Sequence, residues 1–326
     1  MAGVSPAAVS RYLNGGPVSE EKKERIRAAI EQTGFQPNTM ARTMRTGQGN
    51  EIGIIAPRID SESTSEILAG VSDQLQGSGY GILLGVSGEQ STSGGQGNQE
   101  VQCIGTMQTQ QVAGIILMGT VMTPELRDAI QGSRKPIVVT GQNFADCSCV
   151  CHSDYESMKE LTRRMIRRGR RQIAYIGVFE EDRAAGFARR RGAEDAWKEE
   201  TGGQMPLMRV TADGFRTDSG RRAMEELLQR DPLPDGVVCA SDQIAIGAMT
   251  VIRGAGLRVP EDISVAGVGD SWADAATAPP LTTVHLYYRQ CGREAADLLL
   301  RQIRFPEDAR PEVIRLGYEI IERESM

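Results

Sequence analysis

The sequence predicts an α/β protein in which two lobes, each a doubly wound parallel sheet, follow a small all-α head. Two patterns carry this prediction. Short apolar runs alternate with amphipathic helical stretches from residue 51 onward, whereas the first fifty residues have the caps and breaks of short helices. There is also a weak internal repeat, because residues 112–117 and 234–239 both run from a helix end into an apolar strand. We therefore expect two similar lobes with a ligand cleft at the carboxyl ends of their strands.

The composition is that of a globular protein without membrane spans. The chain has 326 residues, 40% of them hydrophobic and 25% charged, and its apolar runs, such as 115–118, are far shorter than the roughly 20 residues that cross a bilayer. The first thirty residues contain no apolar signal segment. We therefore expect a cytoplasmic protein that does not contact a membrane.

The charge is divided unevenly along the chain. Residues 1–50 carry seven basic and four acidic side chains, although the whole chain has a net charge of −6. A basic head on an acidic body is typical of a nucleic-acid-binding module joined to a regulatory domain, although a solvated helix face would give the same count.

The head contains signals for two short helices. Ser5 followed by Pro6 is a helix start, and Asn14-Gly15 is a stop, so the first helix has about two turns. A second helix is predicted from Ser19 to Gly34, followed by the X-Pro break at 35–38, a short stretch at 39–46 and a linker at 47–50.

The body alternates strands with helices. Helices are predicted at 64–76, from about 99, and at 124–131. Buried parallel strands are predicted at 52–56, 81–85, 114–118, 136–139, 172–176, 236–239 and 262–266.

No catalytic or metal-binding pattern emerges. The chain has no H-E-x-x-H, G-x-S-x-G or Walker A motif and only two histidines, so we expect that it is not an enzyme and holds no cofactor. Cys147, Cys149, Cys151 and His152 could share a strand face, but the paired C-x-x-C spacing of a structural zinc site is absent. The sequence favours small buried cysteines and no metal.

Two stretches of the head resemble the lactose-repressor/galactose-repressor (LacI/GalR) family of bacterial transcription regulators. They are residues 2–14, AGVSPAAVSRYLN, and residues 35–41, FQPNTMA. In that family the first stretch is the turn and recognition helix of a helix-turn-helix, and the second leads into a hinge helix. Further likeness lies in residues 240–249, 256–267 and 279–284, so the resemblance covers nearly the whole chain. Residues 267–274 with 281–285 look most like the sucrose- and trehalose-operon regulators.

The resemblance implies a set of DNA-contacting residues. Small outward side chains on the first helix allow close approach to the major groove, and Arg11 can contact a guanine or a phosphate. Hinge residues would wedge into the minor groove, and the chain has Met44 where the family usually has leucine. The implied residues are Ser5, Pro6, Ala7, Ser10, Arg11 and Asn14 of the head, and Asn38, Ala41 and Met44 of the hinge.

The chain departs from the family at its beginning. The family's first helix would precede Ala2-Gly3, and only its last residues are present. Without that apolar partner a module of this size is marginal, so we expect weak specific DNA binding from the chain as written. We expect stronger binding from a product with about ten more N-terminal residues.

The resemblance also implies the domain plan. The body would have the periplasmic-binding-protein fold, whose lobes are joined by crossings near Cys151, Thr283 and Pro311. The expected bounds are a partial headpiece at 1–36, a hinge and linker at 37–50, and an effector-binding and dimerisation domain at 51–326. Within that domain the N-lobe takes about 51–150 plus 284–310, and the C-lobe takes about 151–282 plus 311–326.

The effector implied is a mono- or disaccharide, or its phosphate. By resemblance Arg189 matches the family's effector-contacting arginine, Ser241 stands where many members have asparagine, and Phe215 stands where some have a stacking aromatic. Gly269 occupies the place of a common sugar-binding aspartate, a loss for which nearby side chains could compensate. The other candidates are Asp270 and Trp272 beside that glycine, and Arg58, Asp60 and Gln142 at strand ends of the other lobe.

The function implied is allosteric control of transcription. A homodimer would bind a pseudo-palindromic operator as a repressor of a carbohydrate-utilisation operon, and the effector would change the DNA affinity by favouring one lobe orientation. Induction and co-repression both stay open. The alternative is a cytoplasmic sugar-binding sensor that has lost competent DNA binding.

Overall fold

A computed structural model describes residues 2–13, 16–33, 49–88, 99–119, 121–144, 146–203 and 205–326. The chain divides into two compact units, Met1–Asn50 and Glu51–Met326, which are described separately. None of the helices in these ranges is long and apolar enough to cross a membrane.

The first unit contains two short helices, as predicted. Helix α1 covers Pro6–Leu13 and helix α2 covers Glu20–Thr33. The Ser5 hydroxyl accepts a hydrogen bond from the Ala8 N–H at 3.3 Å, which satisfies one of the open donors at the start of α1. Ala8 and Ile26 are the buried apolar residues among those described, so this unit has a small core.

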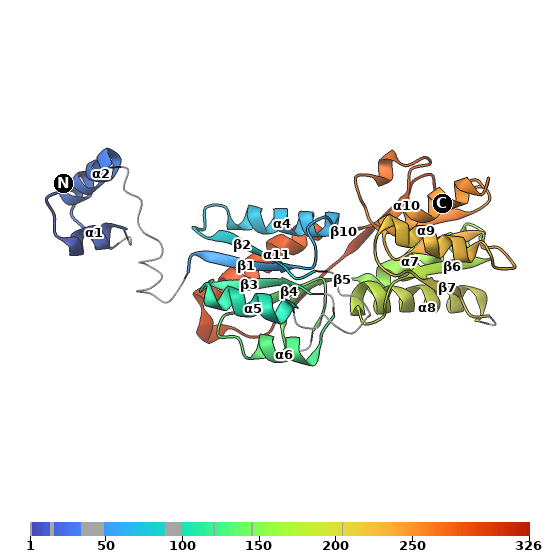
Figure 1. Cartoon of the computed structure of the whole chain (residues 1–326), viewed down its shortest axis with the longest axis horizontal. Helices are drawn as coiled ribbons and strands as arrows, with labels where there is room; N and C mark the ends of the chain where they lie inside the picture. The colour runs from blue at the N-terminus through green and yellow to red at the C-terminus, as the bar shows by residue number, and fades with distance from the viewer. Residues whose placement is uncertain are drawn as a thin grey trace. The chain divides into compact units, whose positions relative to one another are not determined.

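The second unit consists of two sheets of six strands (Figure 1). The first has the order β11-β5-β4-β3-β1-β2 and is parallel throughout. Its strands are β1 Glu51–Ala56, β2 Gly81–Val86, β3 Gly114–Met118, β4 Ile137–Thr140, β5 Ser148–His152 and β11 Val313–Leu316. The central strands are buried along their whole length because helices cover both faces.

The second sheet has the order β12-β10-β9-β8-β6-β7, and only β12 runs antiparallel to its neighbour. Its strands are β6 Ile173–Gly177, β7 Met208–Thr211, β8 Gly236–Cys239, β9 Ser264–Gly269, β10 Thr282–Leu286 and β12 Tyr318–Ile321. This sheet has the same doubly wound arrangement as the first. The repeat in the sequence therefore corresponds to two similar lobes.

Helices pack on both faces of each sheet in neighbouring pairs (Figure 1). In the first lobe these are α4 Glu62–Leu75 with α11 Tyr288–Arg304, and α5 Gln99–Thr109 with α6 Pro124–Gln131. In the second lobe they are α7 Asp154–Arg167 with α8 Arg189–Thr201, and α9 Thr217–Leu227 with α10 Asp242–Gly254. A π-helix at Arg183–Ala188 leads directly into α8.

The chain crosses between the lobes three times, at Ser153, Tyr287 and Gly317. The first crossing lies beside its predicted position at Cys151, whereas the other two come later than the predicted Thr283 and Pro311. The expected bounds therefore need correction, because β10 belongs to the second sheet and β11 pairs with β5 in the first. The first and third crossings are joined, since the Ser153 N–H and hydroxyl both donate to the Leu316 carbonyl, at 3.1 and 2.9 Å.

Candidate functional site

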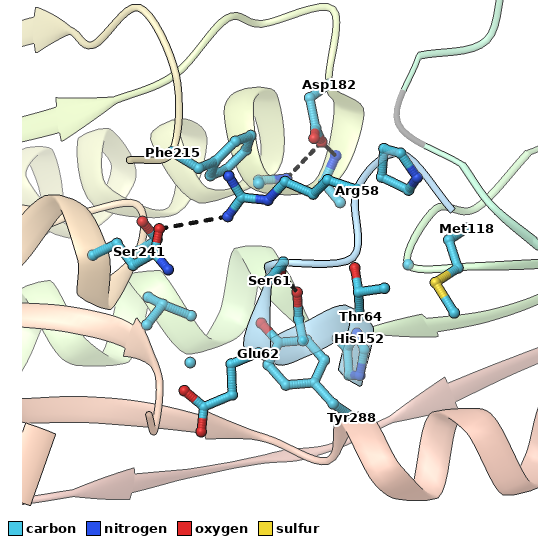
Figure 2. Close-up of a pocket in the computed structure, with 18 of the residues that line it drawn as sticks. Arg58, Ser61, Glu62, Thr64, Met118, His152, Asp182, Phe215, Ser241 and Tyr288 are labelled. Atoms are coloured by element: carbon cyan, nitrogen blue, oxygen red, sulfur yellow. Dashed lines mark hydrogen bonds between the residues drawn. The ribbon is translucent and has the colours of Figure 1, made fainter. Parts of the chain in front are cut away.

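A pocket of about 270 Å³ lies between the two lobes of the second unit (Figure 2). Its walls come from residues that follow the carboxyl ends of strands in both sheets, which is where a doubly wound fold binds ligands. The first lobe contributes Pro57, Arg58, Ser61, Glu62, Ser63, Thr64, Ile67, Met118, Gly119, Thr140, Gly141, Gln142, His152 and Tyr288. The second lobe contributes Asp154, Phe179, Asp182, Ala184, Ala185, Arg189, Asp213, Gly214, Phe215, Ser241, Asp242, Gln243, Val268, Gly269 and Ser271.

Arg189 is the most deeply buried cation of this pocket. Its Nε and Nη2 atoms each lie 2.7 Å from Asp154 Oδ1, and its Nη1 donates to the Ala240 carbonyl. Burial works against the guanidinium charge, but the Asp154 carboxylate keeps the pKa of Arg189 above its ordinary value. The arginine is therefore a fixed, charged part of the wall, not one of several solvated arginines on a helix face.

Gln142 connects the two lobes. Its amide nitrogen donates to Asp182 Oδ1 at 2.7 Å, and both side chains are buried. Asp182 caps the π-helix by accepting from the N–H groups of Ala184 and Ala185, at 3.0 and 2.8 Å. Burial raises the pKa of Asp182, whereas the hydrogen bonds from Gln142 and Ala185 favour the ionised carboxylate.

Three further residues that the sequence suggests as effector contacts, Arg58, Phe215 and Ser241, also line the pocket. Figure 2 shows the Arg58 side chain extending towards the second lobe, where its Nη2 lies 3.5 Å from Gln243 Oε1. The Phe215 ring meets the Phe179 ring edge to face, with centroids 6.1 Å apart. Ser241 is the N-cap of α10 and accepts a hydrogen bond from the Ile244 N–H.

Three other predicted residues do not line the pocket. Asp60 lies at its rim, where it pairs with Arg216 at 3.1 Å and with Arg58 at 3.7 Å. Asp270 is held by Arg323 at 2.6 Å and by His285 at 3.0 Å. The Trp272 side chain is 79% exposed.

The reason for the different placement of Asp270 and Trp272 lies in the loop after β9. Asp270 has a left-handed backbone with φ +56°, and the Trp272 N–H donates to Glu62 Oε1 of the other lobe at 3.0 Å. Gly269 fits because a Cβ there would lie 2.6 Å from Asp242 Oδ2. The carboxylate beside the pocket at this point therefore belongs to Asp242.

Sequence reasoning missed several polar residues of the pocket, namely Thr140, His152, Asp154, Asp182, Asp242 and Tyr288. The signal that could identify Thr140 and His152 is their place at the ends of apolar strands. Both side chains are buried. In the part of the chain that the structure describes, Thr140 Oγ1, Gln142 Oε1 and His152 Nε2 have no hydrogen-bond partner. Buried polar atoms without partners are costly, so they indicate groups that a ligand would satisfy.

The cysteines are free thiols, and they do not form a metal-binding cluster with other side chains of the described residues. In the described ranges no three histidine, cysteine, aspartate or glutamate side chains could hold a metal ion. Cys149 and Cys151 lie on β5 and are buried, and burial raises the pKa of Cys149 to about 11. The thiols at these positions contribute to packing.

The first unit presents the predicted nucleic-acid face of α1. Ser5, Pro6, Ala7 and Arg11 are exposed, and Ser10 is half-buried. The Arg11 Nε donates to the Ala7 carbonyl at 3.4 Å, so its guanidinium lies along the exposed side of the helix. The other predicted contacts, Asn14, Asn38, Ala41 and Met44, lie outside the described residues.

Both parts of the chain match known families. Residues 1–38 match the lacI family of bacterial regulatory proteins, and residues 162–326 match the periplasmic binding protein-like domain. The transcriptional regulator RegA of Clostridium saccharobutylicum is 30% identical over 99% of this chain and 96% of its own length. The Staphylococcus xylosus sucrose operon repressor is 28% identical over 93% of this chain and 92% of its own length.

Solved structures give the same result. A complex of the transcriptional regulator CelR with cellobiose is 28% identical, with a TM-score of 0.77 over 100% of this chain and 97% of the other. A lac repressor dimer bound to operator superimposes with a TM-score of 0.87 over 99% of this chain and 96% of the other, at 21% identity. The second likeness supports the fold.

Proposed function

The chain belongs to the LacI family of bacterial regulatory proteins, and on this basis we propose that it represses a carbohydrate-utilisation operon by binding a pseudo-palindromic operator. A sugar or sugar phosphate in the pocket between the lobes controls this binding. One observation carries the proposal: a pocket lined by buried polar groups lies between the lobes, next to crossings at Ser153 and Tyr287, in a chain that also has a basic helical unit. The proposal includes no catalytic step.

The pocket supports control by linkage. Its walls belong to different lobes, so a ligand that contacts both favours one relative orientation of the lobes over others. The resulting change in DNA affinity equals the coupling free energy, which is typically about 1–3 kcal/mol. The effector can therefore change operator affinity about 5- to 150-fold.

An exposed apolar strand supports a homodimer. β2 is an edge strand of the first sheet, and the side chains of Ile82, Leu84 and Val86 are 42%, 42% and 51% exposed. Exposed apolar side chains on a sheet edge favour contact with another protein surface. A second copy of this chain, related by a two-fold axis, would cover both edges and present two heads to a two-fold operator.

The test is a fluorescence-anisotropy titration of the chain on DNA from upstream of its own gene, with and without candidate sugars. We expect binding that weakens as salt concentration rises and that changes at least fivefold when an effector is present. An Arg11→Ala variant should bind at least tenfold more weakly, whereas Arg258→Ala, which removes an exposed arginine of the second lobe, should bind as the parent does. Absence of DNA binding at low salt, or equal binding by the Arg11 variant, would overturn the proposal.

A further inference from the structure

The first-lobe wall of the pocket contains three buried polar atoms that have no hydrogen-bond partner among the described residues, namely Thr140 Oγ1, Gln142 Oε1 and His152 Nε2. In the described part of the chain, the other residues with such atoms are Thr162, Tyr175, Arg190 and Asp274, and none of those lines the pocket. The three side chains are only 1%, 3% and 5% exposed. Three polar atoms that could still form hydrogen bonds therefore lie on the same wall of the pocket.

The fold brings these three residues to one edge of one sheet. Thr140 ends β4 and pairs with Val150, His152 ends the neighbouring parallel strand β5, and Gln142 lies two residues beyond the end of β4. Because side chains alternate along a strand, Thr140 lies on the same face as Val138, and His152 on the same face as Val150. Those two valines belong to the apolar core under α4 and α11. Thr140 and His152 therefore lie where this core meets the pocket.

The amide of Gln142 has a fixed orientation. Its nitrogen donates to Asp182 at 2.7 Å, and Asp182 is itself fixed by two backbone N–H groups of the π-helix. The nitrogen is therefore engaged across the cleft, and the carbonyl oxygen is the atom that remains for a ligand.

The imidazole of His152 also has a defined role. Burial lowers its pKa, so the ring is neutral at neutral pH, and the bond to the Tyr287 backbone, which favours the protonated ring, is one to a carbonyl. Since Nε2 is the atom without a partner, that bond must come from Nδ1–H. The neutral ring carries one proton, so Nε2 is an acceptor. Figure 2 shows the ring beside Thr64 and Tyr288, and its centroid lies 5.1 Å from that of Tyr288.

We propose that Thr140, Gln142 and His152 form a subsite that receives the hydroxyl groups of an uncharged carbohydrate, and that the pocket selects neutral sugars over their phosphate esters. This inference rests on the proposed function, which leaves both classes of effector open. Two acceptors and one hydroxyl match the donors of a sugar. A phosphate has acceptor oxygens and negative charge, so it needs hydrogen-bond donors. Of the three groups, the threonine hydroxyl is the one that can donate to it.

The charges around the pocket agree with this selection. Five carboxyl groups line it, those of Glu62, Asp154, Asp182, Asp213 and Asp242, against the two guanidinium groups of Arg58 and Arg189. Of the five, Asp154 is paired with Arg189, and Asp213 is paired with Arg222 outside the pocket lining. Arg189 is already occupied by Asp154 and by the Ala240 carbonyl. Arg58 lies 3.7 Å from Asp60 at the rim. A phosphate would therefore find both lining arginines already engaged by carboxylates, and the Glu62 carboxylate beside it would repel it.

The test compares neutral sugars with their phosphates on the full chain. Thermal shift and calorimetric titration are carried out with glucose, cellobiose, sucrose and trehalose, and with the 6-phosphates of glucose, sucrose and trehalose. We expect the tightest ligand to be a neutral sugar, bound at least tenfold more tightly than any phosphate ester of the set. A phosphate as the tightest ligand, or a set in which no member raises the midpoint, would overturn the subsite.

Variants test the residues themselves. Thr140→Val keeps the side-chain shape and removes the hydroxyl, and His152→Phe removes the acceptor; each should weaken binding of the best sugar about three- to tenfold. The matched control is Thr162→Val, which removes an equally buried, unpartnered hydroxyl from α7 outside the pocket and should leave the affinity unchanged. Parental affinity in Thr140→Val contradicts the subsite even if His152→Phe fails to fold. Failure of the proposed function is a separate result, because it appears in the DNA titration, either as absent DNA binding, as equal binding by the Arg11 variant, or as binding that no ligand alters.

Discussion

At the scale of single residues, a pair of carboxyl groups joins the pocket wall to the core behind it, because Asp242 lines the pocket and Asp274 does not. Asp242 and Asp274 are both buried, and the Asp242 carboxylate accepts from Thr283 Oγ1 at 2.6 Å and from the Ser271 N–H at 3.2 Å. Among the described residues neither carboxyl oxygen of Asp274 has a hydrogen-bond partner. Burial and the neighbouring Asp242 raise the pKa of Asp274, so Asp274 keeps its proton and can donate it to Asp242.

This pair predicts an unusual pH dependence of stability. In the unfolded chain Asp274 ionises at its ordinary value of 3.8, whereas in the folded chain it still holds a proton above that pH. The folded state then binds more protons, so the free energy of unfolding falls as pH rises above 3.8. Asp274→Asn supplies an N–H donor to Asp242 without a titrating proton. We expect the variant to match the parent near pH 4 and to be more stable by at least about 1 kcal/mol at pH 8, measured by urea unfolding.

An exposed carboxyl group provides the control for this measurement. Arg258 holds the pKa of Asp262 below its ordinary value, so the contribution of Asp262 is present above that value and is lost as pH falls. Asp262→Asn should therefore be slightly less stable than the parent at pH 8, the opposite sign to Asp274→Asn. Equal stability of the Asp274 variant and the parent at pH 8 would contradict the shared proton.

Residues of the pocket can be predicted from the sequence where a local sequence pattern indicates their position in the fold. Gln142 follows an apolar strand, and Arg189 stands in a basic run of a helix that resembles a known family, so both are predicted. Asp270 and Trp272 were expected in the pocket because they adjoin Gly269, but the conformation of that loop depends on Asp242, 27 positions earlier on another element. A contact between β9 and α10 has no signature in the local pattern, so these two placements could not be predicted.

At the scale of elements, three helix pairs approach so closely that their backbones touch, namely α4 with α11, α9 with α10, and α7 with α8. A Cβ at Gly70 of α4 would lie 1.9 Å from the Arg289 carbonyl oxygen of α11, and one at Gly292 of α11 would lie 2.1 Å from the Ile67 oxygen of α4. Gly220 of α9 and Gly247 of α10 meet each other's helices in the same way. Helix positions follow from apolar periodicity, but these glycines have a role only once the pairing of helices is known.

Gly70→Ala should therefore destabilise the first lobe. The added methyl group has no space unless α4 and α11 move apart, and overpacking of this kind costs about 1–3 kcal/mol. Gly105→Ala in α5 is the matched control, because no atom lies within 4 Å of its added Cβ. That control should be stabilised by about 0.5–1 kcal/mol. Denaturant unfolding of both variants measures the difference, and a stabilised Gly70 variant would contradict the close approach.

At the scale of the whole effector-binding unit, contacts across the cleft hold the lobes in the arrangement described here. Gln142 with Asp182 is a buried contact, whereas Asp60 with Arg216 is an ion pair at the rim, with side chains 54% and 57% exposed. The rim pair joins the lobes without lining the pocket. A substitution in this pair therefore changes the free energy of lobe closure without removing a contact to the ligand.

Reversing one charge of the rim pair should favour separation of the lobes. Arg216→Glu places two acidic groups at the rim, so we expect sugar affinity to fall about two- to fivefold, as suits an exposed pair worth up to about 1 kcal/mol. The double variant Asp60→Lys with Arg216→Glu restores the attraction and should recover the affinity. At 0.5 M salt, where the Debye length is only about 4–5 Å, the difference should largely disappear. Calorimetric titration at low salt and at 0.5 M salt checks these outcomes. An affinity that the double variant does not recover would contradict a role of the rim pair in lobe closure.

The three crossings also bear on how the protein is made. The first lobe is built from residues 51–152 together with α11 and β11, which follow nearly the whole second lobe in the chain. On the ribosome, β1–β5 therefore emerge long before the helix and edge strand that cover them. The second lobe, apart from β12, is continuous in the chain, so it can form its core before the first lobe is complete. Until α11 is synthesised, one apolar face of the first sheet lacks the helix that covers it. We therefore expect the nascent chain to bind chaperones most during synthesis of residues 154–286, before α11 is available to pack on the first sheet.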